Sequence, residues 1–142
     1  MRVTVLVKSD ERTESGDFGE EHEYVEMGKF NEELVNAGVM LAGEGLHPSS
    51  KGARVRFDGD SRAVMKGPFP GPRDLVAGFW LWKVESLDEA IGWLKRAPFD
   101  GGTEVEIRQV MEAEDFGDVL TPEVREQEER LRARVEELGK MS

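Results

Sequence analysis

The sequence predicts an α+β fold, in which helices cover one face of a mainly antiparallel sheet in the order βαββαβ, with an inserted β-hairpin and an extra C-terminal helix. Three observations predict it. Apolar runs of strand length occur at four places in the chain. Two amphipathic segments between these runs have the three-to-four-residue spacing of helices. The pair Asp58-Gly59 stands between two further alternating runs, which is typical of a hairpin turn.

The first half of the chain is expected to form a strand, a loop, a helix and a second strand. Valines alternate with other residues over 1–8, as in a strand, and the polar residues 9–21 are predicted to be a loop. The helix that follows ends at Gly38, a residue suited to the left-handed C-terminal position. Residues 39–46 then form the second strand. The amphipathic spacing of this helix is formed by Tyr24, Met27, Phe30 or Asn31, and Leu34.

The second half begins with the hairpin and a constrained loop. The loop, residues 66–76, contains several prolines and glycines. The most apolar strand, residues 77–84, precedes a helix that Ser86 and Glu89 can cap together and that Pro98 ends. Residues 103–110 are the last strand.

Two of the predicted strands are apolar on both faces. Phe79 and Leu81 alternate with Trp80 and Trp82, although a sheet covered on one side should alternate apolar with polar residues. We therefore expect a homodimer that buries the second sheet face, because rows of exposed aromatic residues are rare on monomers. The alternative cover is the C-terminal helix.

That helix belongs to a C-terminal extension, residues 119–142, after a domain over residues 1–118. Thr121 is its expected N-cap and Pro122 its first residue. Its narrow apolar stripe suits packing at a dimer edge, on its own subunit or against a partner protein. The stripe consists of Val124, Leu131, Val135 and Leu138.

Composition excludes several classes of function. The net charge of −11 argues against nucleic-acid binding, and no apolar run is long enough to cross a membrane. Two histidines without cysteine give no metal-site spacing, and nucleotide-binding glycine loops and a GxSxG motif are absent, so we expect neither a metal nor another cofactor. We expect a soluble, cytoplasmic protein.

The middle of the chain is basic. Between Glu44 and Lys83 there are seven basic and four acidic residues, a net charge of +3. This stretch predicts a small anionic ligand, with pairing between arginines and acidic helices as the alternative. Lys66 and the arginines Arg73 and Arg56 are the candidate anion-binding residues, and Trp80 either stacks on the ligand or belongs to the core.

Residues 42–57, AGEGLHPSSKGARVRF, form a polar, glycine-jointed segment that follows the second strand. It is either a strand-end turn or the wall of a ligand site. His47 is suited to proton transfer near neutral pH, and Glu44 is its candidate partner. We expect His47 and Lys66 to share one concave surface.

Several motifs together resemble one family. GEGLHPS, GPF and AGFW occur in order, followed by SLDEAIGWLKRAP and EVEIRQV. Over residues 1–116 the chain resembles the YCII-related, DGPF-type family. The resemblance implies a ferredoxin-like fold, dimerisation through the sheets as in dimeric α/β-barrel proteins, and a pocket between sheet and helices. Lys66 replaces the aspartate of the family's DGPF motif, which puts a histidine–aspartate acid/base pair in doubt.

Three functions remain open: a dimeric protein that binds a small anion, a cofactor-independent enzyme such as an isomerase, lyase or dehalogenase that uses His47 as acid/base, and an interaction module acting through the C-terminal helix. The replacement of the motif aspartate by Lys66 favours the first.

Overall fold

The computed structural model describes residues 1–140 and divides into two compact units, Met1–Val110 and Met111–Ser142. The first unit contains the sheet predicted from the sequence. Its strands β1 (Arg2–Lys8), β2 (Met40–Gly45), β5 (Val76–Lys83) and β6 (Val105–Gln109) lie in the order β2-β5-β1-β6, and all neighbours are antiparallel. This arrangement confirms the predicted fold class.

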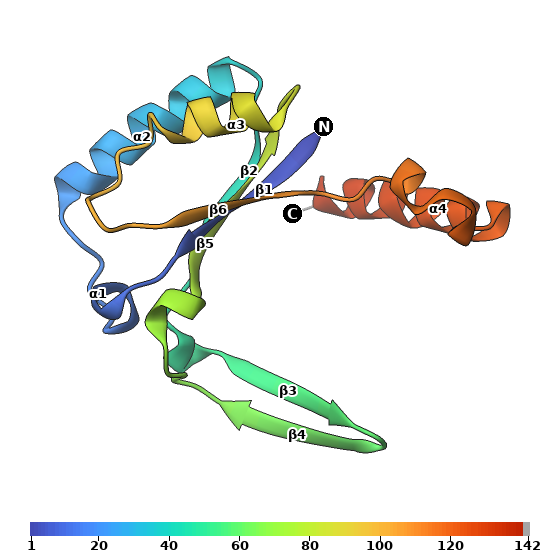
Figure 1. Ribbon diagram of the computed structural model, residues 1–142, viewed down its shortest axis with the longest axis horizontal. Coiled ribbons are helices and arrows are strands. Elements are labelled where there is room, and N and C mark those ends of the chain that lie inside the picture. The colour runs from blue at the N-terminus through green and yellow to red at the C-terminus, as the bar shows by residue number, and fades with distance from the viewer. Residues whose placement is uncertain (141–142) are drawn as a thin grey trace. The chain divides into compact units, whose positions relative to one another are not determined.

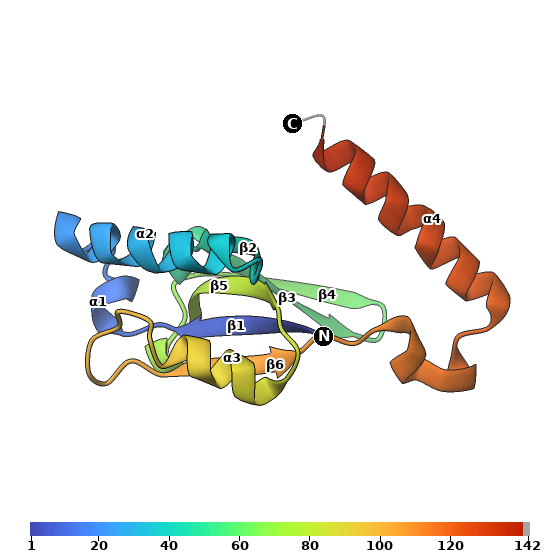
Figure 2. The same ribbon diagram turned by 90° about the horizontal axis from the view of Figure 1, so that it is seen from above.

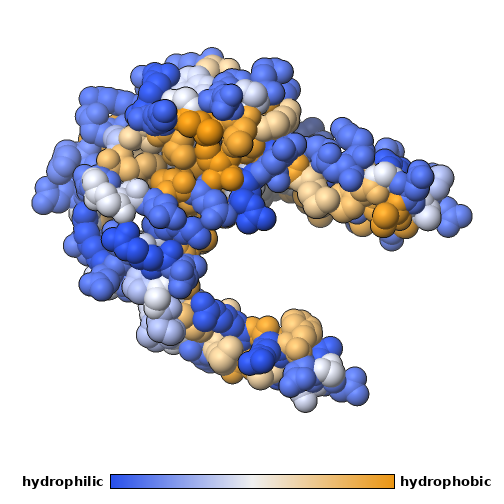
Figure 3. Space-filling view, viewed as in Figure 1, coloured by the Kyte–Doolittle hydropathy of each residue, from blue (hydrophilic) through white to orange (hydrophobic). Residues whose placement is uncertain are grey.

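Helices α2 (Glu21–Asn36) and α3 (Leu87–Leu94) lie on the same side of this sheet (Figures 1 and 2). The core forms between the two layers, where Val3, Val5, Leu34 and Trp82 are fully buried. Phe30 of α2 contacts Trp80 edge-on, with ring centroids 5.9 Å apart. Apolar residues reach the surface between α3 and β6, at the edge of the sheet (Figure 3).

The two faces of β5 differ in burial. Gly78, Trp80 and Trp82 face the helices and are buried, whereas Phe79 and Leu81 on the opposite face are only half-buried. The pairing with β1 places Leu6 beside Phe79 on that second face. The apolar second face predicted from the sequence therefore exists, and the dimer expected to cover it stays a prediction.

A short helix, α1 (Glu11–Glu14), lies within the segment predicted to be a loop. The carboxylate of Asp10 caps it by accepting a hydrogen bond from the backbone N–H of Thr13, at 2.8 Å. The loop prediction was therefore wrong for these four residues, because a single turn is too short to show periodicity.

At the C-terminal end of α2, Gly38 has a φ angle of +73° and ends the helix as predicted.

The hairpin pairs β3 (Ala53–Asp58) with β4 (Ser61–Lys66) in a separate two-stranded sheet that extends away from the main sheet (Figure 1). Its turn contains Gly59 at φ +57°, as the Asp58-Gly59 pair predicted. All residues of the hairpin, 53–66, are exposed. Two short 3₁₀ segments, η1 (Ser49–Lys51) and η2 (Pro72–Asp74), flank the hairpin.

The second unit consists of η3 (Ala113–Val119) and helix α4 (Pro122–Gly139). The hydroxyl of Thr121 caps α4 by accepting from the N–H of Val124, as predicted. The apolar stripe of α4 is exposed within this unit, and partner binding through it stays a prediction. Within residues 1–140, the helices are all too short or too polar to span a lipid bilayer.

Candidate functional site

A hollow lies between the sheet and the helices where two strand glycines face each other. In the pairing of β2 with β5, Gly45 is opposite Gly78, and Gly43 is opposite Trp80. Directly opposed residues of an antiparallel pair point to the same face, and Trp80 points towards the helices. The Gly45–Gly78 pair therefore leaves a patch of bare backbone on the helix-facing side. A cavity of about 260 Å³ occupies this place.

Apolar and aromatic side chains surround this bare floor. Met27 and Asn31 of α2 line one side, and Trp80 lines the end nearest the core. Phe99, which follows α3, contacts Trp80 edge-on at a centroid distance of 6.0 Å. The cavity is therefore a small, mainly apolar space, and its lining also includes the polar residues Asn31 and Glu44.

The Trp80 ring is held in a fixed position beside the hollow. Its indole N–H donates to Oδ1 of Asn31 at 2.9 Å. A Cβ atom added at Gly43 would lie 2.8 Å from both Trp80 Cδ1 and Met40 Cε. Glycine at position 43 thus lets the ring lie flat on the strand. The pairing of β2 with β5 is irregular between Met40 and Ala42, whereas Gly43 and Gly45 lie in regular register.

A second, larger cavity of about 460 Å³ adjoins the first. The two share Met27, Gly45, Ala77 and Phe99 in their linings. The larger one extends from this shared wall towards α1, the loop before α2, and the segment after α3. Its further lining includes Phe18, Tyr24, His47, Pro48, Pro98 and Thr103.

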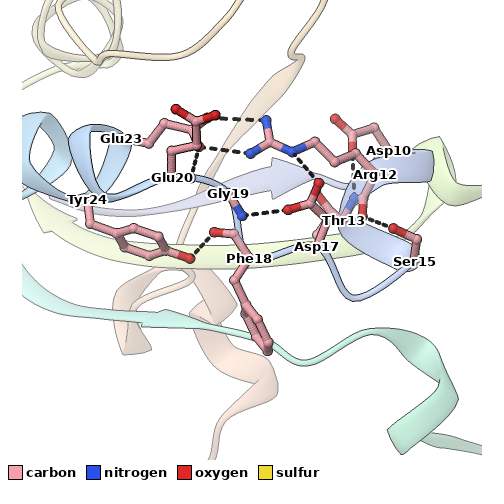
Figure 4. A network of polar contacts seen from close by, with 10 residues as sticks. All are labelled: Asp10, Arg12, Thr13, Ser15, Asp17, Phe18, Gly19, Glu20, Glu23 and Tyr24. Carbon is pink, nitrogen blue, oxygen red and sulfur yellow. Dashed lines mark hydrogen bonds and ion pairs between the residues drawn. The ribbon is translucent and has the colours of Figure 1, made fainter.

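Carboxylates dominate the charge of the larger cavity. Among the described residues, the lining has a single arginine, Arg12. Its guanidinium donates hydrogen bonds to both carboxylate oxygens of Glu23, at 2.8 and 3.2 Å, and lies 3.3 Å from the carboxylate of Asp17 (Figure 4). The hydrogen bonds from Arg12, followed by the backbone N–H of Glu20, lower the pKa of Glu23 to about 2. Asp10 and Asp100 also line the cavity. Among the described residues, the lining thus carries four carboxylates, and Arg12 is already paired with two of them, Glu23 and Asp17.

Three hydrogen bonds made by Ser49, here called the Ser49 node, fix the chain segment that forms the cavity wall next to His47. Both the N–H and the hydroxyl of Ser49 donate to the carboxylate of Glu14, at 2.8 and 2.5 Å. The same hydroxyl accepts from the N–H of Phe69 at 2.9 Å. A side chain at Gly67 would collide with the carbonyl oxygen of Ser49. The GPF segment, residues 67–69, therefore packs against the segment that follows His47, and these three residues lie outside the lining of the cavity.

The structure brings only some of the predicted site residues together. His47 lines the larger cavity, while Glu44 and Trp80 line the smaller one. The three predicted anion-binding residues line neither of these two cavities. Lys66 is exposed at the end of β4, opposite Ala53; Arg56 is exposed in the hairpin; and Arg73 donates to the carbonyl oxygen of Gly102 at 2.9 Å. Because Lys66 lines neither cavity, neither of them is the concave surface that His47 and Lys66 were expected to share.

Sequence reasoning missed several residues that line the cavities, among them Asn31, Phe99 and Arg12. A signal existed for the floor, because a glycine inside a strand often marks a close approach of a ligand or another backbone. No such signal existed for Asn31, which occupies a helix position that also suits a core residue. Within residues 1–140, no three histidine or carboxylate side chains are grouped so as to hold a metal ion.

Comparisons with known proteins give a family, a curated relative and a similar solved structure. Residues 1–114 match the family described as YCII-related domain. The chain is 31% identical over 97 residues to the uncharacterized protein R00369 of Rhizobium meliloti (strain 1021), which covers 67% of this chain and 78% of that protein. It is also similar to the solved structure of 5-chloro-2-hydroxyhydroquinone dehydrochlorinase (TftG) from Burkholderia phenoliruptrix AC1100 in complex with 2,5-dihydroxybenzoquinone. That similarity has a TM-score of 0.40 and 15% identity, and covers 81% of this chain and 98% of that chain.

Proposed function

The chain belongs to the YCII-related family, and we propose that it binds a small molecule in the hollow above the Gly45–Gly78 pair. The glycine pair is the observation that carries this proposal. It removes two side chains from the helix-facing side of an otherwise well-packed sheet, and the space is surrounded by aromatic and thioether side chains. Concave, mainly apolar sites with a few polar groups are typical of small-molecule sites.

The size and charge of the site limit the ligand. A cavity of about 260 Å³ is below the usual range for drug-sized ligands, so it suits a group of about one ring. The adjoining carboxylates favour a neutral or cationic group. Anion binding stays a separate prediction for Lys66, Arg73 and Arg56, which lie outside both cavities.

Three compounds of one shape test this proposal. Benzamide, benzamidinium and benzoate share a ring and differ in head-group charge. We expect benzamide, which is neutral and has a carbonyl oxygen, to shift the Trp80 indole N–H signal in ¹H–¹⁵N NMR spectra. Benzoate should bind more weakly because of its negative charge, and benzamidinium because it has no oxygen that could accept from the amide of Asn31. Gly45→Leu should abolish binding, because a Cβ at this position meets no atom within 4 Å and the side chain can enter the hollow.

Gly92→Leu is the matched control. Gly92 lies in α3, lines neither cavity and also has open space at its Cβ position. Its spectrum and binding should match those of the unaltered protein. If none of the three compounds binds the unaltered protein, or if Gly45→Leu binds them as well as Gly92→Leu does, the hollow is not the binding site.

A second candidate function is proton transfer by His47, with Glu44 the partner suggested by the sequence. The supporting observation is that His47 lines the larger cavity, which shares Gly45 with the hollow. A bound ketone would then exchange its α-protons with solvent faster than it does in buffer. We expect the protein to accelerate the exchange of acetophenone methyl protons in D₂O, and His47→Gln to remove the effect. His22→Gln, at an exposed site outside both cavities, should leave it unchanged.

We also propose a homodimer through the second face of the sheet, supported by the half-buried Leu6, Phe79 and Leu81. Sedimentation equilibrium at micromolar concentration should give twice the 15.9 kDa of one chain. Leu81→Glu should give a folded monomer, because a charge cannot be buried there without a partner. Val35→Glu, at an exposed position of α2, is the control. A monomeric unaltered protein would rule out this dimer.

A further inference from the structure

Within residues 1–140, the side-chain oxygen of Asn31 accepts a hydrogen bond, whereas its NH₂ group makes none. The indole N–H of Trp80 can only donate a hydrogen bond. The Asn31 atom that it meets at 2.9 Å is therefore the oxygen, Oδ1. This contact sets the orientation of the whole amide, because a flip would place two donors against each other. The NH₂ group must then point away from the Trp80 nitrogen.

Among residues 1–140, this NH₂ group has no hydrogen-bond partner. Asn31 is half-buried and lines the hollow. Its amide nitrogen is not one of the fully buried polar atoms without a partner; among the described residues, only Trp82 Nε1 has that status. The two N–H donors are therefore accessible to a molecule that enters the cavity. An oriented donor in an aromatic-lined space distinguishes ligands by the acceptor that they carry.

We propose that Asn31 is a ligand-binding residue that selects a flat ring bearing an oxygen acceptor, such as a carbonyl group. The bare backbone at Gly45 and Gly78 gives a flat floor, and Trp80 and Phe99 offer aromatic surfaces beside it. The ring occupies this floor, and its oxygen accepts a hydrogen bond from Nδ2 of Asn31. This inference rests on the proposed function, since it names the chemistry of the ligand in the same hollow.

Two compounds that differ in one oxygen test the role of Asn31. Acetophenone and ethylbenzene have the same ring and side-chain length, but only acetophenone has a carbonyl oxygen. Their dissociation constants are measured by NMR titration of the full chain. Asn31→Leu removes the donor together with the partner of Trp80. Asn31→Asp removes the donor but keeps an oxygen that can accept from Trp80.

We expect both variants to bind acetophenone about 5- to 10-fold more weakly, the effect of one hydrogen bond. Ethylbenzene binding should change by less than about twofold, because apolar contacts remain. Asn36→Asp is the matched control, since Asn36 is exposed at the end of the same helix and lines neither cavity. It should leave both constants unchanged.

The remaining outcomes separate this inference from the proposed function. If both compounds bind and Gly45→Leu abolishes binding, but the Asn31 variants affect the two compounds equally or not at all, the selective role of Asn31 is overturned while the binding site stands. If neither compound binds the unaltered protein, the site itself is refuted and the role of Asn31 falls with it. In the Asn31→Asp variant, the indole N–H signal of Trp80 checks that the hydrogen bond from this indole to the side chain at position 31 is retained.

Discussion

The Ser49 node offers the sharpest test of how the wall bearing His47 is held. Ser49→Ala removes one hydroxyl, which donates to Glu14 at 2.5 Å and accepts from the Phe69 N–H at 2.9 Å. A hydrogen bond to a charged group contributes about 1.5–3 kcal/mol, and a neutral one about 0.5–1.5 kcal/mol. Because Ser49 is only half-buried, water can replace part of both contacts. We therefore expect the free energy of unfolding to fall by about 2 kcal/mol.

Urea unfolding followed by tryptophan fluorescence measures this loss. All three tryptophans belong to the unit that ends at Val110, so the signal reports on the part of the chain that contains the node. Ser50→Ala is the control, because Ser50 is the exposed neighbour and its hydroxyl makes no hydrogen bond within residues 1–140. Its unfolding free energy should change by less than about 0.5 kcal/mol.

The contribution of the Glu14 contact can be isolated by a double-mutant cycle. Ser49→Ala and Glu14→Ala should show a coupling of about 1 kcal/mol or more, since each removes the same contact. Equal stability of Ser49→Ala and Ser50→Ala, or additive effects in the cycle, would refute the claim that this node fixes the wall.

Three further predictions concern packing, charge and the C-terminal helix. Gly43→Ala should destabilise the protein by about 1–3 kcal/mol in urea, because its Cβ would press on Trp80 Cδ1; Gly45→Ala, which meets open space, should cost no stability. The pKa of Glu23 is lowered to about 2, so the pairing with Arg12 stabilises the fold above about pH 4.5 and is lost as the pH falls towards 2. Arg12→Gln should then be less stable at pH 7 and lose less further stability between pH 4.5 and 2; a loss as steep as that of the unaltered protein would contradict this account. Deletion of residues 121–142 should leave cooperative unfolding of the sheet unit, and a truncated chain without a cooperative transition would show that the helix belongs to the core.

The parts of the fold that the sequence predicted are those with local signals. Periodic apolar spacing predicted the strands and α2, and the capping hydroxyl of Thr121 marks the start of α4. The Asp58-Gly59 pair predicted the hairpin turn. Helix α1 has no such signal. Its residue Glu14 is held by Ser49, which lies 35 positions later in the chain, and a contact of that range leaves no local pattern.

The site was less predictable, because its defining feature is the register in which β2 pairs with β5. Gly45 and Gly78 are 33 positions apart, and they face each other only when β2 and β5 pair in the observed alignment. A shift by one residue would place side chains on the floor of the hollow. The basic charge of residues 44–83, which predicted an anion site, is located largely in the exposed hairpin. His47, Glu44 and Trp80 line the cavities, and the catalytic and ligand-binding roles expected for them stay predictions. Asn31 could not be identified from the sequence, because its role depends on the hydrogen bond that it accepts from Trp80.

The strand and loop glycines differ in whether packing requires a glycine at their positions. At Gly43 and Gly67 a Cβ atom would collide with a ring or a backbone carbonyl, so packing alone accounts for glycine at both positions. At Gly45 a Cβ atom would meet nothing within 4 Å, and no positive φ requires glycine there. Glycine inside a strand costs about 0.5–1 kcal/mol relative to alanine, because more backbone entropy is lost on folding. Under the proposed function, the space that glycine leaves open at position 45 is the hollow that Asn31 and Trp80 line.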